Sequence, residues 1–150
     1  MRNKKKKSFL LDMISVLAVT LIVVVALLNI RDWINHTEAV RAMENLSRIV
    51  TEYRAKYQQV PPESYVERIK EELEGYARFG GLKYRALWIG FDSAPDEILA
   101  YLERDYLSWF LRDGFIVLKL DGDVVMMGKD EFKELLAKQQ STMEIKMTEQ

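Results

Sequence analysis

The chain has 150 residues, of which 22 are basic and 23 acidic, and its formal net charge is −1. It contains no cysteine, which excludes disulfide bonds and thiolate chemistry. Residues 31–150 hold 17 basic and 22 acidic residues with no basic stripe, which argues against nucleic acid as a partner.

The N-terminus combines a basic tail, residues 1–8, with an apolar run over 9–30. A helix rises about 1.5 Å per residue, so roughly 20 residues cross a hydrocarbon core of about 30 Å. We therefore predict a transmembrane helix over 9–30 and the lipid bilayer as a partner. The alternative is a cleaved signal peptide, whose apolar core is usually about 7–15 residues and ends in small residues. This run is longer and ends without that small-residue pattern.

The basic residues predict an orientation, because basic flanks of a span stay in the cytoplasm. Residues 1–7 carry five Lys or Arg and no acid, whereas the first fifteen residues after the span carry only Arg31 and Arg41. We expect a single-pass protein of the cell inner membrane with a cytoplasmic N-terminus and a periplasmic domain. Asp12 is the one ionisable residue within the span. It either reaches the headgroups and the lysines or has a functional role.

A second helical pattern begins after the span. Apolar residues from Trp33 to Val60 recur at steps of three and four, and neither Gly nor Pro occurs between Phe9 and Val60. The two stretches are therefore expected to form one helix of about 50 residues. A bend is most expected within 29–35, and Pro61-Pro62 ends the helix.

The rest of the chain predicts a short helix and a small sheet. Ser64-x-x-Glu67 is a capping-box pattern that predicts a helix over 64–78. A strand is expected over 84–89, and the apolar run 98–102 is of ambiguous type. Two apolar runs, 115–120 and 123–127, meet at Asp121-Gly122, which predicts a tight hairpin with these residues as its structural turn.

The predicted end of the chain is a short helix from Lys129, followed by a flexible tail over 139–150. The predicted fold class is thus α+β, in which an N-terminal transmembrane helix continues into an amphipathic helix packed on a small antiparallel sheet. Residues 31–138 would form one extracytoplasmic domain, since they suffice for one modest core.

The sequence offers little for catalysis. His36 is the only histidine, and it is expected to be a surface or interfacial residue. No nucleophile motif, phosphate loop or paired zinc ligands occur. We therefore predict no enzymatic activity, and acid–base chemistry by carboxylates remains a minor alternative because it needs only three-dimensional proximity.

An acidic loop holds Asp92, Asp96 and Glu97, which could bind calcium through their oxygens. The spacing matches no EF-hand, so a solvated turn is the favoured interpretation and calcium the alternative. Trp88 and Trp109 lie at spacings that favour core packing over a carbohydrate or peptide surface. Trp33, just past the span, is expected at the membrane interface.

The order of these parts resembles the bacterial type IV pilins and type II secretion pseudopilins. Their members have a basic leader, an apolar helix that continues as an amphipathic helix, and then a small antiparallel sheet. Here Tyr53 and Tyr57 before Pro61 resemble the end of that helix, and 116–124 resembles the C-terminal hairpin of many members. Residues 98–101 are similar to the strand before that hairpin.

The resemblance implies a role for the leader, in which Ser8, Phe9 and Asp12 would carry processing and assembly. The family's leader ends in Gly where this chain has Ser8, and Asp12 stands in for the family's glutamate, one residue early. Two hypotheses follow. The first is a pilin-like or pseudopilin-like protein that assembles with itself or with similar subunits through its apolar helix, in a secretion or pilus-type system. The second is a single-span envelope protein that never polymerises and whose outer domain is an interaction module. Asp12 favours the first hypothesis and Ser8 the second.

Overall fold

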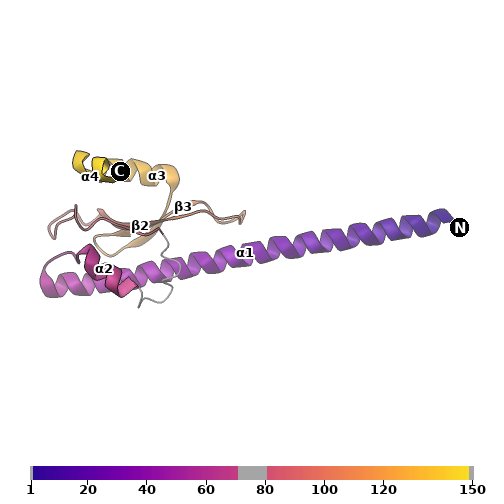
Figure 1. The fold of residues 1–150 in the computed structure, drawn as a ribbon, viewed down its shortest axis with the longest axis horizontal. Coiled ribbons are helices and arrows are strands. Elements are labelled where there is room, and N and C mark those ends of the chain that lie inside the picture. Colours follow the sequence, from indigo (N-terminus) through magenta and orange to yellow (C-terminus); the bar gives the residue numbers. More distant parts are fainter. Residues whose placement is uncertain (1, 71–80, 149–150) are drawn as a thin grey trace.

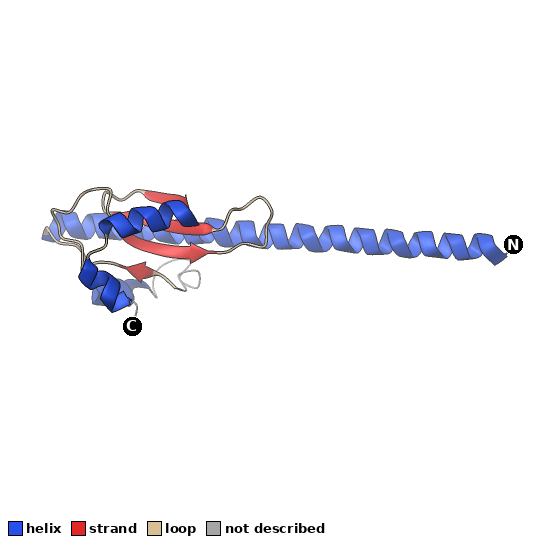
Figure 2. Ribbon diagram, turned by 90° about the horizontal axis from the view of Figure 1, so that it is seen from above, coloured by secondary structure: helices blue, strands red, loops and turns tan. Residues whose placement is uncertain are grey.

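The computed structural model describes residues 2–70 and 81–148. One long helix extends well beyond a small domain, and a four-stranded sheet lies between this helix and the C-terminal helices (Figures 1 and 2). The α+β class is confirmed: a long N-terminal apolar helix is joined to a small antiparallel sheet. The elements in chain order are α1 (Arg2–Tyr57), α2 (Glu63–Lys70), β1 (Lys83–Tyr84), β2 (Ile98–Arg104), β3 (Gly114–Lys119), β4 (Val124–Gly128), α3 (Lys129–Gln139) and α4 (Thr142–Thr148).

Helix α1 has 56 residues and is therefore about 84 Å long. It passes through 29–35 as an unbroken helix, so the expected bend does not interrupt it. It ends at Tyr57 because Gln58 takes a positive φ of 55° and two prolines follow at 61 and 62. Helix α2 begins one residue before the predicted start, and residues 71–78 of that prediction lie outside the described residues.

The four strands are antiparallel in the order β1-β2-β3-β4. The predicted hairpin is confirmed by the pairing of β3 with β4, including Leu118 opposite Val124. The ambiguous run at 98–102 is strand β2. Strand β2 buries apolar side chains on both faces of the sheet because both faces are covered, which explains why its sequence does not alternate. A register shift between Ile98 and Ala100 accompanies the position of the adjacent Leu99 and Ala100 in the same cluster.

Two apolar clusters fill the core, one on each face of the sheet. On the α1 face, Met43 and Leu46 belong to the same buried cluster as Ile116 and Leu118. On the opposite face, Phe132 of α3 stacks on Phe115 of β3, with ring centroids 3.8 Å apart. Successive residues of β3 thus face opposite layers, as expected for a strand that is covered on both sides.

Two predictions of secondary structure were wrong. The strand expected over 84–89 ends at Tyr84, because a turn hydrogen bond from the Trp88 N–H to the Arg85 carbonyl replaces the extended conformation. The segment after Gln139, expected to be a flexible tail, includes helix α4, in which Glu144 is buried.

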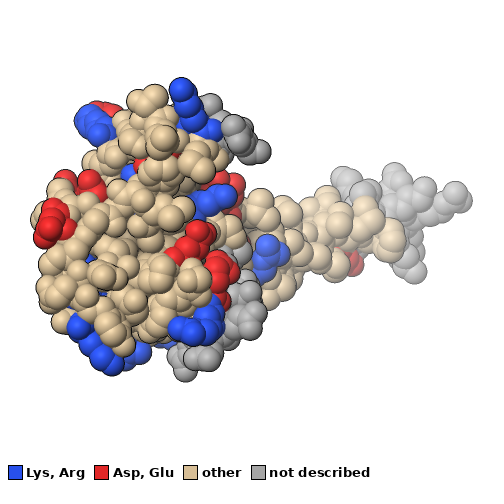
Figure 3. Space-filling view, turned by 60° about the vertical axis from the view of Figure 1, so that its left-hand side comes forward, with Lys and Arg blue, Asp and Glu red and all other residues tan. Residues whose placement is uncertain are grey.

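Among the described residues, α1 is the only helix long and apolar enough to cross a membrane. A signal sequence near an N-terminus has the same length and composition. None of the apolar stretch is buried against the domain. The surface of this part of α1 carries almost no charge, whereas charged residues of both signs are spread over the domain (Figure 3).

Candidate functional site

Polar residues at the end of the apolar stretch of α1 bind the loop between β2 and β3. We call this loop, residues 105–113, the junction loop. The carboxylate of Asp32 accepts hydrogen bonds from the backbone N–H groups of Leu107, at 2.7 Å, and Ser108, at 2.8 Å. The Ser108 hydroxyl donates to the side-chain oxygen of Asn29, also at 2.8 Å. Asn29 and Asp32 are three residues apart and therefore lie on one face of the helix. Asp32 is only 4 % exposed, so this carboxylate is enclosed by the loop that it binds.

A second contact lies one helical turn further along α1. The ring nitrogen Nδ1 of His36 and the hydroxyl oxygen of Tyr106 are 2.8 Å apart, and the two rings meet edge to face. Burial lowers the pKa of His36 below its ordinary value of 6.5, and burial raises the pKa of the Tyr106 hydroxyl. Both groups are therefore held in their neutral forms near pH 7. The predicted interfacial histidine thus joins the helix to the junction loop.

Within the loop, one further backbone N–H is bonded to a carboxylate. The Tyr106 N–H donates to the carboxylate of Asp113 at 2.8 Å, so three consecutive N–H groups, at 106, 107 and 108, all bind carboxylates. The loop is thereby fixed in shape and position without a strand or helix of its own.

The tip of the junction loop is apolar and exposed. Leu107, Trp109 and Phe110 are 74 %, 86 % and 57 % exposed, respectively. A recess of about 370 Å³ lies between this tip and the helix, lined by Val25, Leu28, Asn29, Leu107 and Trp109. The prediction that Trp109 packs in the core was therefore wrong. The loop reaches along α1 toward the N-terminal half of the helix (Figure 2).

The leader residues lie far from this junction. Phe9 and Asp12 are exposed on the apolar stretch of α1, and the side chain of Ser8 lies outside the described part of the chain. The structure brings neither Phe9 nor Asp12 together with a described residue of the domain.

The predicted turn packs against α1. Gly122 has a φ of +100°, and its carbonyl accepts a hydrogen bond of 2.6 Å from the Ser47 hydroxyl. The Asp121 carboxylate accepts a 3.0 Å bond from the Asp123 N–H. The turn residues therefore attach the hairpin to the long helix and have a structural role.

The acidic loop does not assemble a metal site. Asp92 and Asp96 are exposed, and the loop is held by backbone contacts, including a bond from the Leu120 N–H to the Glu97 carbonyl. Within residues 2–70 and 81–148, no three His, Cys, Asp or Glu side chains are grouped so that they could hold a metal ion. The calcium interpretation of Asp92, Asp96 and Glu97 gains no support from this geometry.

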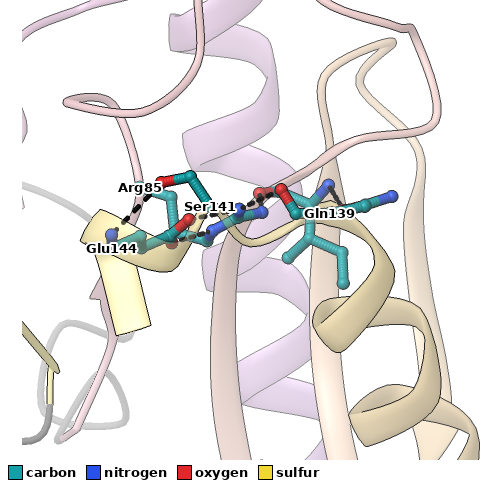
Figure 4. A network of polar contacts seen from close by, with 5 residues as sticks. Arg85, Gln139, Ser141 and Glu144 are labelled. Carbon is teal, nitrogen blue, oxygen red and sulfur yellow. Dashed lines mark hydrogen bonds and ion pairs between the residues drawn. The ribbon is translucent and has the colours of Figure 1, made fainter. Parts of the chain in front are cut away.

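A buried ion pair forms a separate polar cluster at the C-terminal end (Figure 4). Arg85 Nε lies 2.6 Å from Glu144 Oε1, and Nη2 lies 2.9 Å from Oε2. Gln139 and Ser141 take part as well, since Gln139 accepts from the Ile98 N–H and Ser141 from the Glu144 N–H. These contacts attach α4 to the sheet and leave no reactive group open to a substrate.

The sequence contained two signals for the junction. Asp32 is an acidic residue directly after a long apolar stretch, and 106–111 is too apolar for an ordinary exposed connection. Neither signal identifies the other as its partner, because 75 residues separate Asp32 from Leu107.

Comparisons with known proteins give no relative for this arrangement. No protein-family model, no curated protein and no solved structure matches the chain.

Proposed function

We propose that this protein is a non-enzymatic, single-span membrane protein that holds an interaction domain at a fixed height and angle beside the bilayer. Its N-terminus lies in the cytoplasm and residues 31–148 lie on the outer side of the inner membrane. The five basic residues before the span support this orientation.

The observation that carries the proposal is the continuity of α1. The same unbroken helix exposes apolar side chains over 11–27 and buries Ala39, Met43 and Leu46 in the core of the domain. A flexible linker would let a domain move freely relative to its anchor. Here the anchor and the domain share one element, and the junction loop reinforces it at Asn29 and Asp32.

The polar groups of the domain support contact rather than catalysis. Asp32 accepts hydrogen bonds from backbone N–H groups, Glu144 pairs with Arg85, and His36 is hydrogen-bonded to Tyr106. The two carboxylates and the histidine therefore already have partners that stabilise the fold.

Pilin-like assembly through the apolar helix is a second candidate, favoured by one observation. Asp12 is exposed on the apolar part of α1, where a carboxylate is costly in lipid unless it finds a partner. A neighbouring subunit could supply that partner. The order of elements, a long helix followed by strands that end in a hairpin, is also compatible with pilin-like assembly.

Cysteine labelling tests the membrane topology, because the chain has no native cysteine. Asn3→Cys and Asp92→Cys are compared with a membrane-impermeant maleimide in intact and lysed cells. We expect Asp92→Cys to react once the outer envelope is opened and Asn3→Cys to react only after the inner membrane is broken. Equal labelling of both, or release of the protein by an alkaline carbonate wash, would refute the proposal.

The intact mass and N-terminal sequence of the extracted protein separate the two candidates. A chain that begins at Met1 supports the permanent anchor. A chain that begins at Phe9 would indicate prepilin-type processing despite Ser8 and make assembly the leading candidate.

A further inference from the structure

The exposed apolar tip of the junction loop needs an explanation. Leu107, Trp109 and Phe110 are consecutive except for Ser108, which is buried and bonded to the helix. Soluble surfaces rarely gather large apolar side chains in this way, and such patches mark contacts with proteins or membranes. The ring centroids of Trp109 and Phe110 are 6.5 Å apart, so the two rings form one apolar surface.

The position of the tip identifies what covers it. Leu107 and Trp109 line a recess together with Val25, Leu28 and Asn29. Val25 lies five residues before Ile30, the end of the predicted span, and therefore about 7 Å inside it. If α1 spans the membrane, side chains beside Val25 and Leu28 are at the depth of the outer headgroups and upper acyl chains. Interfacial segments bury their apolar faces to a similar depth of about 5–10 Å, and tryptophan is enriched there.

The first part of the loop backbone, residues 106–108, is suited to that environment. A non-helical segment at membrane depth is tolerated only where its polar groups are satisfied, because lipid offers them no partners. The N–H groups of Tyr106, Leu107 and Ser108 all donate to carboxylates, and the Ser108 hydroxyl donates to Asn29. The exposed side chains of Leu107, Trp109 and Phe110 are apolar.

We infer that the junction loop is a second membrane contact, in which Leu107, Trp109 and Phe110 enter the outer leaflet beside α1 and the recess accepts a lipid acyl chain. This inference rests on the proposed function, since it requires α1 to span the bilayer. A single helix can rotate about its axis and change its tilt in a membrane. A second, off-axis contact restrains both motions, so the domain presents one constant face away from the membrane. Assembly into a filament would require the loop to leave the lipid.

Fluorescence quenching by lipid tests the inference on the full-length protein. The chain has three tryptophans, so Trp33→Phe with Trp88→Phe leaves Trp109 as the only one. The protein is reconstituted into phosphatidylcholine vesicles with or without bromine on the upper part of the acyl chains. We expect brominated lipid to quench Trp109 at least about twice as strongly as Trp88, because interfacial indoles lie at the headgroup level.

Two controls use the same chain. A variant that keeps only Trp88, which is half-buried in the domain, supplies the reference for a tryptophan remote from the bilayer. Trp88 is three residues before Phe91, and the Phe91 carbonyl accepts a hydrogen bond from Arg54. Arg54 lies 22 residues after Asp32 on α1, so this part of the domain is about 33 Å from the junction. A variant without native tryptophans but with Leu17→Trp reports whether α1 is in the bilayer, because Leu17 is exposed in the middle of the apolar stretch.

The outcomes are distinct. Strong quenching both in the Leu17→Trp variant and at Trp109 supports the inference. Quenching in the Leu17→Trp variant without quenching of Trp109 overturns the inference and leaves the membrane anchor intact. Absence of quenching at both positions overturns the anchor and the inference together. If Trp109 is shielded from aqueous acrylamide but unaffected by brominated lipid, the tip is covered by a second copy of the chain and the lipid contact is refuted.

A second measurement covers the case in which the multiple substitutions disturb the fold. Quenching is measured for the native chain and for Trp109→Phe alone, and the difference is the contribution of Trp109. No difference between the two would overturn the inference independently of the single-tryptophan variants.

Discussion

Asp32 on α1 accepts a 2.8 Å hydrogen bond from the backbone N–H of Ser108, 76 residues later in the chain. The same oxygen accepts from the Leu107 N–H, so one buried carboxylate binds two consecutive N–H groups of the junction loop. This contact lies where the apolar part of α1 ends and the domain begins, and it therefore links the position of the loop to the position of the anchor.

The first prediction concerns that carboxylate. Asp32→Ala leaves two N–H groups without an acceptor, and each buried unsatisfied group costs about 1–3 kcal/mol. We expect the free energy of unfolding to fall by at least about 2 kcal/mol. Asp32→Asn should lose less, because its amide oxygen can still accept both bonds. Urea unfolding of the full chain in detergent measures the difference.

Arg31→Ala is the matched control for this prediction. Arg31 is exposed and lies 4.0 Å from Asp32, so its removal should change stability little. Equal effects of Asp32→Ala and Arg31→Ala would mean that the loop does not depend on the Asp32 carboxylate.

The second prediction concerns pH. Burial holds the pKa of His36 below 6.5 in the folded protein, so the unfolded state binds the proton more readily. Stability is therefore fully present above pH 6.5 and is lost as the pH falls from 6.5 toward the lower folded pKa. Carboxylates face the same junction, since Asp32 and Asp113 both lie near Tyr106.

Substitution isolates the share of the histidine in this pH dependence. In His36→Gln the decrease in unfolding free energy between about pH 7.5 and about pH 5.5 should be smaller than in the native chain, with carboxylate contributions unchanged. Tyr106→Phe keeps the ring contact and removes the hydroxyl, so it should retain the pH dependence of a buried histidine. An unchanged pH profile in His36→Gln would show that another group is responsible.

The long helix and the hairpin could be predicted because their causes are local. No Gly or Pro interrupts α1, and Asp121-Gly122 provides the turn between two apolar runs. The extent of β1 and the presence of α4 could not be predicted in this way. Strand β1 ends at the turn closed by the Trp88 N–H and the Arg85 carbonyl, and α4 is attached through Arg85 and Glu144, which form one buried pair although 59 residues separate them.

The candidate site was less accessible to sequence reasoning than the fold. An apolar loop and an apolar core strand have the same composition, so Trp109 was assigned to the core. The position of Trp109 is set by the contact between Asp32 and the loop. Hydropathy patterns do not show which distant segments of a chain make contact. The roles of Ser8, Phe9 and Asp12 in assembly remain predictions, and the structure places no described residue of the domain beside Phe9 or Asp12.

The third prediction concerns the hairpin turn. Gly122 has a φ of +100°, and an added Cβ would lie 3.3 Å from both Ser47 Oγ and Thr51 Oγ1. A left-handed conformation costs a residue with a side chain roughly 1–2 kcal/mol, so Gly122→Ala should destabilise the domain by at least that amount. Gly128→Ala is the control, because that position has an ordinary φ of −65° and open space around it. If the two variants unfold at the same temperature, the turn does not require glycine.

The fourth prediction concerns the buried ion pair at the C-terminal end. Arg85 and Glu144 are 5 % and 2 % exposed, and Arg85 also donates to the Ile98 carbonyl at 2.6 Å. Glu144→Ala leaves the guanidinium buried without its carboxylate, a change that typically costs about 3–5 kcal/mol. We expect a loss of that order together with faster amide hydrogen exchange in α4. Glu134→Gln removes one partner of an exposed pair with Lys138 on α3 and should leave stability unchanged.

The double variant Arg85→Met with Glu144→Leu separates the charge from the packing. Buried ion pairs can often be replaced by apolar side chains of similar volume without loss of stability, because the desolvation penalty offsets the Coulomb attraction. We therefore expect the double variant to recover much of what Glu144→Ala loses. If Glu144→Ala were as stable as the native chain, α4 would not depend on the pair, and the original expectation of a flexible C-terminal tail would regain its basis. If the double variant were no better than Glu144→Ala, the bond from Arg85 to the Ile98 carbonyl would be the contact that holds this end of the sheet.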